Sequence, residues 1–118
     1  MFQAEVSCHR GDGYVAVRVT GDVDMGTRAE LAAALDRAVA AGMLLVVVDL
    51  SAVRFFAAAG VHCVERAVGE IEARGGRAHL VCPSPGPVWR VVSLLGLDRE
   101  WLVHHDVAEA VAGCAAGR

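Results

Sequence analysis

The segment from Met43 to Leu50 constrains the fold more than any other, because it is apolar at every position except Asp49. A strand with one face in water alternates apolar and polar residues, whereas a continuous apolar run is typical of a strand covered on both faces. Such strands lie inside parallel sheets, whose neighbouring strands are joined by helical crossovers. The segment therefore predicts a central parallel strand and an α/β fold.

The first twenty residues have the pattern of two strands that each bury one face. Apolar and polar residues alternate from Phe2 to His9 and again from Val15 to Thr20. The Gly11-Asp12-Gly13 segment between them is a turn signal, so we expect an antiparallel hairpin. A loop is expected over residues 21–26, because two glycines and two aspartates interrupt the alternation there.

Helical spacing of apolar residues recurs in the rest of the chain. It predicts helices over about residues 28–41, 58–74, 88–95 and 107–114, with further strands over 77–82 and 101–104. The helix faces expected to be buried include Leu31 and Leu35 in the first helix and Val61, Val64, Val68 and Ile71 in the second. We therefore predict a single domain over residues 1–118, α/β, with a mixed sheet of about five strands and about four helices, in which the hairpin is followed by β-α-β crossovers.

Two helix starts carry a capping signal and one lacks it. Thr27 with Glu30, and Asp106 with Glu109, have the spacing of a capping box, in which each side chain bonds the other residue's amide. The second helix starts instead within Ala57-Ala58-Ala59, after a loop predicted over residues 51–56. The absence of a capping side chain costs a helix about 1 kcal/mol. Either this junction has no binding role, or alanines stand where a polar site once had its side chains.

Composition excludes several classes of function. The net charge is -3, and the 11 basic residues, all arginine, are scattered and form no basic stripe of the kind that nucleic acids require. No apolar run approaches the roughly 20 residues of a membrane span, and no secretory signal is visible, so we expect a cytoplasmic protein. With no lysine, no phosphate-binding glycine loop and no Gly-x-Ser-x-Gly elbow, we expect no catalytic residue and no cofactor.

The cysteines, histidines and paired acids do not predict a metal site. The four cysteines are widely spaced, so we expect four small buried side chains and no metal or redox pair. The five histidines are expected to be structural or surface residues, because adjacent residues such as His104 and His105 point to opposite sides of a strand. Asp22 and Asp24 are predicted to be acids of a solvated loop. For Phe55 and Phe56 the first expectation is a core role for each, and the alternative is that one of the two is exposed beside the helix start.

Three segments together resemble the STAS domain of anti-sigma factor antagonists. They are Gly21-Asp22-Val23-Asp24, Val48-Asp49-Leu50-Ser51-Ala52-Val53-Arg54-Phe55 and Leu94-Leu95-Gly96-Leu97. The resemblance covers nearly the whole chain in order. It implies binding to an anti-sigma factor that is also a serine kinase, and it aligns the family's phosphoacceptor serine with Ala58 and the preceding acid with Ala57. Because alanine has no hydroxyl, the family's phosphorylation switch is predicted to be absent at this position.

The resemblance implies a partner-binding surface at the loop and at the start of the second helix. Its expected residues are Asp22, Asp24, Phe56, Ala57, Ala58, Ala59, Gly60 and Val61. Asp24 is expected to match the acid that the family uses to bind the kinase. We therefore predict an anti-sigma factor antagonist-like regulator that is not an enzyme.

The sequence leaves two other functions open. One is a non-switching STAS subunit of a larger stress-signalling or lipid-transport assembly. The other is a nucleotide- or anion-binding module that uses the uncapped helix start. A homodimer through the edge of the first hairpin is a further option.

Overall fold

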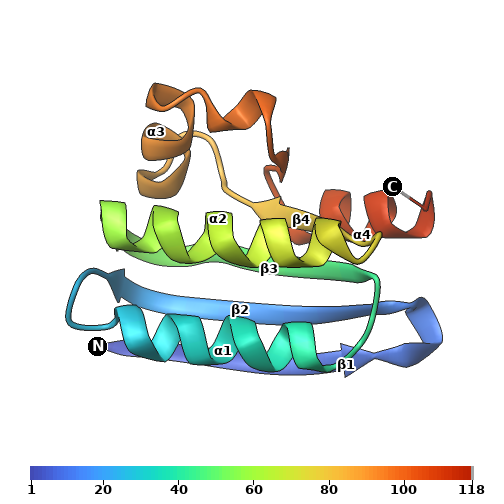
Figure 1. Ribbon diagram of the computed structural model, residues 1–118. Helices are drawn as coiled ribbons and strands as arrows, with labels where there is room; N and C mark the ends of the chain where they lie inside the picture. Colours follow the sequence, from blue (N-terminus) through green and yellow to red (C-terminus); the bar gives the residue numbers. More distant parts are fainter. Residues whose placement is uncertain (118) are drawn as a thin grey trace.

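The strands lie in the sheet in the same order as in the chain, with β1 at one edge and β5 at the other (Figure 1). In this computed structural model, which describes residues 1–117, they are β1 (Phe2–His9), β2 (Tyr14–Val23), β3 (Leu45–Phe56), β4 (Arg77–Val81) and β5 (Leu102–His104). β1 and β2 are antiparallel, and every later neighbouring pair is parallel. The mixed sheet of five strands is confirmed.

Four helices cover the two faces of this sheet unequally. They are α1 (Arg28–Ala40), α2 (Ala58–Ala73), α3 (Pro87–Leu94) and α4 (Val107–Ala115), with short 3₁₀ turns at Arg10–Asp12 (η1) and Leu97–Arg99 (η2). α1 and α2 lie side by side in Figure 1 and pack on one face. α4 packs against β3, β4 and β5, where it contributes to a separate cluster.

The central strand β3 is buried on both faces, as its continuous apolar run predicts. Val46 and Val48 belong to the main core with α1, α2 and α3, whereas Val47 belongs to the smaller cluster with Ala110 and Cys114 of α4. The predicted helix faces are also confirmed, since Leu31, Leu35, Val61, Val64, Val68 and Ile71 are all buried. Each fully buried side chain of this size contributes about 1.5–3 kcal/mol through the hydrophobic effect.

β3 is longer than predicted, and the loop expected over residues 51–56 was wrong. The strand continues to Phe56 because it keeps its pairing with β2, which itself runs through the expected loop to Val23. The register between the two strands shifts twice, and each shift leaves one extra residue in β3. The first lies before Ala52 and the second is Arg54. Residues of this kind form β-bulges, which bend a strand and re-aim its side chains.

The cysteines do not all behave as expected. Cys82 and Cys114 are buried, Cys63 is half-buried, and Cys8 is exposed, so the prediction of four buried side chains was wrong for Cys8. Cys8 is near the end of the edge strand β1. Burial, assisted by the charge of Asp49, raises the pKa of the Cys82 thiol to about 12, so this thiol is protonated at neutral pH.

The predicted cap of α4 is confirmed, with one difference. The Asp106 carboxylate accepts a hydrogen bond from the Glu109 amide at 2.8 Å, as in a capping box. The Glu109 carboxylate accepts from the amide of His105 at 3.0 Å, one residue before the cap. Both acids therefore satisfy amides at the start of this helix.

Arg74 connects the end of α2 to the segment that follows α1. The chain turns at Gly75 (φ +86°), where the Gly76 amide donates to the Ile71 carbonyl and the Gly75 amide to the Glu72 carbonyl. Just before this turn, the Arg74 guanidinium donates to the carbonyl oxygens of Val39 and Met43. One side chain thus satisfies main-chain acceptors at the end of α1 and in the connection to β3.

We expect Arg74→Met to lower the free energy of unfolding by about 2 kcal/mol, because two partly buried carbonyls lose a charged donor. Urea unfolding measures the change. Arg66→Met is the matched control, since Arg66 forms an exposed pair with Glu70 and its loss is expected to cost less than about 0.5 kcal/mol. Equal effects of the two substitutions would contradict the role given to Arg74.

Candidate functional site

The predicted binding residues lie where β2 and β3 end side by side. Val23 is opposite Phe56 in the parallel ladder, and the Ala57 amide donates to the Val23 carbonyl at 2.9 Å. The loop after β2 and the first turn of α2 therefore leave the sheet from the same edge. This is the carboxyl edge of the parallel strands, where ligands of open α/β sheets commonly bind.

The loop after β2 is held by Thr27, and not by the predicted capping box. The Thr27 hydroxyl donates to the Asp22 carbonyl at 2.9 Å and accepts from the Asp24 amide at 3.0 Å. The Thr27 amide donates to the Asp24 carboxylate at 3.1 Å. The expected bond from the Glu30 amide to Thr27 is absent from the start of α1, because the hydroxyl is turned back to the loop.

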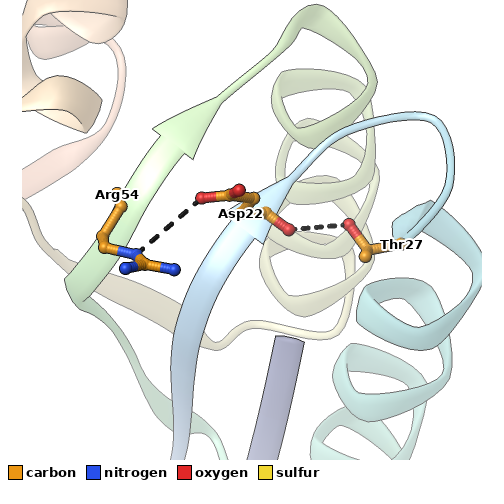
Figure 2. Close-up of polar contacts among 3 residues, drawn as sticks. All are labelled: Asp22, Thr27 and Arg54. Atoms are coloured by element: carbon orange, nitrogen blue, oxygen red, sulfur yellow. Dashed lines mark hydrogen bonds and ion pairs between the residues drawn. The ribbon is translucent and has the colours of Figure 1, made fainter. Parts of the chain in front are cut away.

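Arg54 and Asp22 come together at the second bulge of β3. Figure 2 shows the guanidinium pointing to the Asp22 carboxylate, with Nε 4.0 Å from Oδ1, while the Asp22 carbonyl accepts from Thr27. The two side chains are 72% and 46% exposed, so the pair contributes little to stability. It offsets the charge of Asp22 and leaves the Asp24 carboxylate, which accepts only uncharged donors, as the stronger local negative charge.

The first turn of α2 is only partly accessible. Ala57 is the N-cap in an extended conformation and its side chain makes no cap hydrogen bond, as predicted. Ala57 is half-buried and Ala58 is exposed. The other predicted residues of this junction, Phe56, Ala59, Gly60 and Val61, are buried, so their side chains support the surface without forming it.

Gly60 fits α2 tightly against the ends of the two strands. A Cβ atom at this position would lie 2.6 Å from Val23 Cγ1 and 2.7 Å from Phe56 Cε1. Both neighbours are buried and have little room to move. The glycine therefore sets how closely the exposed first turn approaches the sheet.

Two exposed apolar side chains extend the surface beyond the expected set. Phe56 is buried, whereas Phe55 is 53% exposed, so the expected core role is confirmed for Phe56 and was wrong for Phe55, which follows the alternative of one exposed ring. Met25, in the loop after β2, is 74% exposed. No sequence pattern indicated the exposure of Met25 or the position of Arg54, because each depends on where the loop and the bulges place the backbone.

His79 and His104 lie under α4, whereas His62 is exposed on α2, one turn after Ala58. His79 Nδ1 lies 3.0 Å from His104 Nε2, and His105 Nδ1 lies 3.1 Å from the Cys82 carbonyl. Over residues 1–117, no group of three or more histidine, cysteine or acidic side chains is placed to hold a metal ion. In the same part of the chain, no helix is both long and apolar enough to cross a membrane.

Comparison with protein families matches residues 4–110 to the STAS domain. The chain belongs to the STAS domain family. Among solved structures, this STAS domain is similar to an anti-sigma factor antagonist from Mycobacterium paratuberculosis, with 27% identity, a TM-score of 0.86, and 96% of this chain and 93% of that chain covered. No curated protein matches the sequence.

Two more distant structures share the fold of this STAS domain. A putative anti-sigma factor antagonist from Thermotoga maritima has 21% identity and a TM-score of 0.79, with 96% of this chain and 93% of that chain covered. The phosphorylated form of the Bacillus cell fate determinant SpoIIAA has 23% identity and a TM-score of 0.65, with 97% of this chain and 99% of that chain covered.

We expect Gly60→Ala and Gly69→Ala to change stability in opposite directions, although both lie in α2. An added methyl group at Gly60 collides with Val23 and Phe56, which costs about 1–3 kcal/mol. Nothing lies within 4 Å of a Cβ at Gly69, where alanine is the better helix former by up to about 1 kcal/mol. Urea unfolding of both variants measures the two changes in the free energy of unfolding. A Gly60→Ala variant as stable as the unsubstituted chain would contradict the tight fit.

Proposed function

We propose that this STAS domain is an anti-sigma factor antagonist-like regulator that binds an anti-sigma factor serine kinase. Its docking surface consists of Asp22, Asp24, Phe55, Ala57 and Ala58. The observation that carries the proposal is that two acids, an exposed aromatic ring and a small exposed helix start meet at one edge of the sheet. The likeness over almost the full length to an anti-sigma factor antagonist supports it.

The chemistry of this docking surface favours a partner with an apolar contact flanked by basic groups. Phe55 offers apolar area of the kind that anchors interfaces. Asp24 supplies a negative charge, because Thr27 orients its carboxylate without neutralising it. Ala57 and Ala58 let a partner's backbone approach the first turn of α2 closely.

A serine at residue 58 would carry a hydroxyl that the alanine lacks. Phosphorylation adds about -1.5 to -2 charges and a bulky, strongly hydrated group, which would prevent the close approach of a partner to the first turn of α2. With Ala58 in this position, the proposed complex has no such switch at the start of α2. It is controlled by the amounts of the two proteins, by mass action.

The same acids argue against the nucleotide- or anion-binding alternative. A phosphate at the amides of Ala58 and Ala59 would approach the carboxylates of Asp22 and Asp24, and only Asp22 has a nearby arginine. No catalytic step is assigned to the chain, because the docking surface combines no nucleophile with a base. The alternative of a permanent subunit in a larger assembly shares this surface and differs only in how slowly the complex dissociates.

We expect Phe55→Ala to weaken binding to the cognate kinase by tenfold or more, because the exposed aromatic ring of the docking surface is lost. Each anti-sigma factor serine kinase of the source organism is immobilised, and the full chain is titrated over it by biolayer interferometry. Leu44→Ala is the matched control, since Leu44 is 54% exposed but lies before β3, at the other end of that strand. Binding to none of the kinases, or equal loss in both variants, would overturn the proposal.

We expect Ala58→Ser to restore phosphorylation, because it returns a hydroxyl to the exposed first turn of α2. The wild-type chain and the variant are incubated with the kinase identified by binding and ATP, and intact mass and peptide mapping locate any phosphate. The variant should gain one phosphate at residue 58 and lose affinity for the kinase. Phosphate on a serine or threonine beside α2 in the wild-type chain would contradict the absence of a switch.

A further inference from the structure

The outer edge of β1 has no role in the docking surface described above. Within residues 1–117, β1 pairs with β2 on one side and with no strand on the other. Its ladder with β2 is continuous from Phe2 to His9, unlike the bulged ladder of β3. β1 contains no proline and no lysine, two of the residues that proteins use to protect such an edge from pairing.

The two faces of this edge differ in polarity. Phe2, Ala4 and Val6 are half-buried and pack against the main core, and Cys8 continues the same face with its side chain exposed. Apolar surface is thus left partly uncovered along the edge. The opposite face carries the polar residues Gln3, Glu5, Ser7 and His9.

We propose that β1 pairs antiparallel with β1 of a second copy of this chain, with Val6 opposite Val6, so that the two five-stranded sheets become one. Main-chain hydrogen bonds along both strands hold such a pair, as in other cases of strand addition. The half-buried apolar face of each copy then covers that of the other. We infer a second copy as the occupant because β1 is complementary to itself in this register.

The Val6-centred register follows from the charges of β1 and from the polarity of its two faces. In a continuous sheet, residues directly opposite one another share a face, so the sum of the paired residue numbers is even. Centred on Val6, the pairing places Glu5 opposite Ser7 and Ala4 opposite Cys8. It brings no like charges together.

The neighbouring registers are worse for identifiable reasons. Centred on Glu5, the pairing places two carboxylates directly opposite each other, which is destabilising. Centred on Ser7, it pairs only residues 5–9 of β1 and leaves Phe2 and Ala4 uncovered. Centred on Ala4, it pairs only residues 2–6, whereas the Val6 register pairs residues 3–9. Registers with an odd sum place apolar residues opposite polar ones.

Two substitutions of opposite charge at Ser7 test the proposal, because they should change the Kd of the dimer in opposite directions. Sedimentation velocity of the full chain over a wide concentration range gives the Kd of the dimer. Because the symmetric pair contains the Glu5–Ser7 contact twice, Ser7→Lys should tighten the dimer by roughly three- to tenfold and Ser7→Glu should weaken it by a similar factor. Circular dichroism and thermal unfolding confirm that both variants are folded, since Ser7 is exposed.

A disulfide tests the register independently. In the wild-type chain the Cys8 residues are not opposite each other, whereas Ala4→Cys would place a second thiol opposite Cys8 of the other copy. Mild oxidation of this variant should give a covalent dimer that is lost on reduction. Adding Cys8→Ser to the same variant should abolish it.

Three results would overturn the proposal. One is a chain that remains monomeric up to about millimolar concentration, where mass action favours even a weak dimer. Another is a dimer whose Kd changes in the same direction, or not at all, in the two Ser7 variants. The last is an Ala4→Cys dimer that persists with Cys8→Ser. None of these measurements involves the proposed kinase.

Discussion

The parallel pairing of β2 with β3, maintained past two bulges, is the constraint on which the rest of the structure depends. It keeps Val23 beside Phe56 and allows the Ala57 amide to bond the Val23 carbonyl, so the loop and α2 leave the sheet together. Without this continuation, the acids of one connection and the helix start of the other would not share a surface. The bulges determine which side chains reach this surface, because they place Arg54 next to Asp22 while Phe56 remains in the core.

The docking surface combines a rigid support with a polar rim that contributes little to stability. Gly60, Phe56 and Val61 are buried and fix the position of the first turn of α2. Thr27 fixes the loop through three hydrogen bonds at 2.9–3.1 Å. These contacts limit the motion of the proposed docking surface, and limited motion lowers the entropic cost of association.

Periodicity in the sequence predicted the elements well, because burial imposes it. The run around Val46–Val48 required helices on both faces, and the structure has them. The ends of β2 and β3 were missed, because a bulged strand that leaves Ser51, Arg54 and Phe55 exposed has no alternation to detect. Ser51, the first residue of the segment predicted as a loop, instead remains in β3, and its hydroxyl donates to the Asp49 carboxylate at 2.6 Å.

The resemblance to the family directed attention to the loop after β2 and to the start of α2, and binding there stays a prediction. The sequence did not predict which side chains are exposed, because a helix turns neighbours such as Ala58 and Ala59 in different directions. The role of Thr27 was wrong for a related reason. Its hydroxyl can bond either the helix or the loop before it, and only the folded path of that loop decides between them.

The unequal clusters on the two faces imply an unequal distribution of local stability. α4 is secured by a small group that includes Val47, Val81 and Ala110, while α1 and α2 share the main core. Protection of main-chain amides from hydrogen exchange follows such differences, because a segment opens alone when few apolar contacts hold it. The amides of α4 would then exchange through a sub-global opening, while those of α2 exchange only when the whole sheet unfolds.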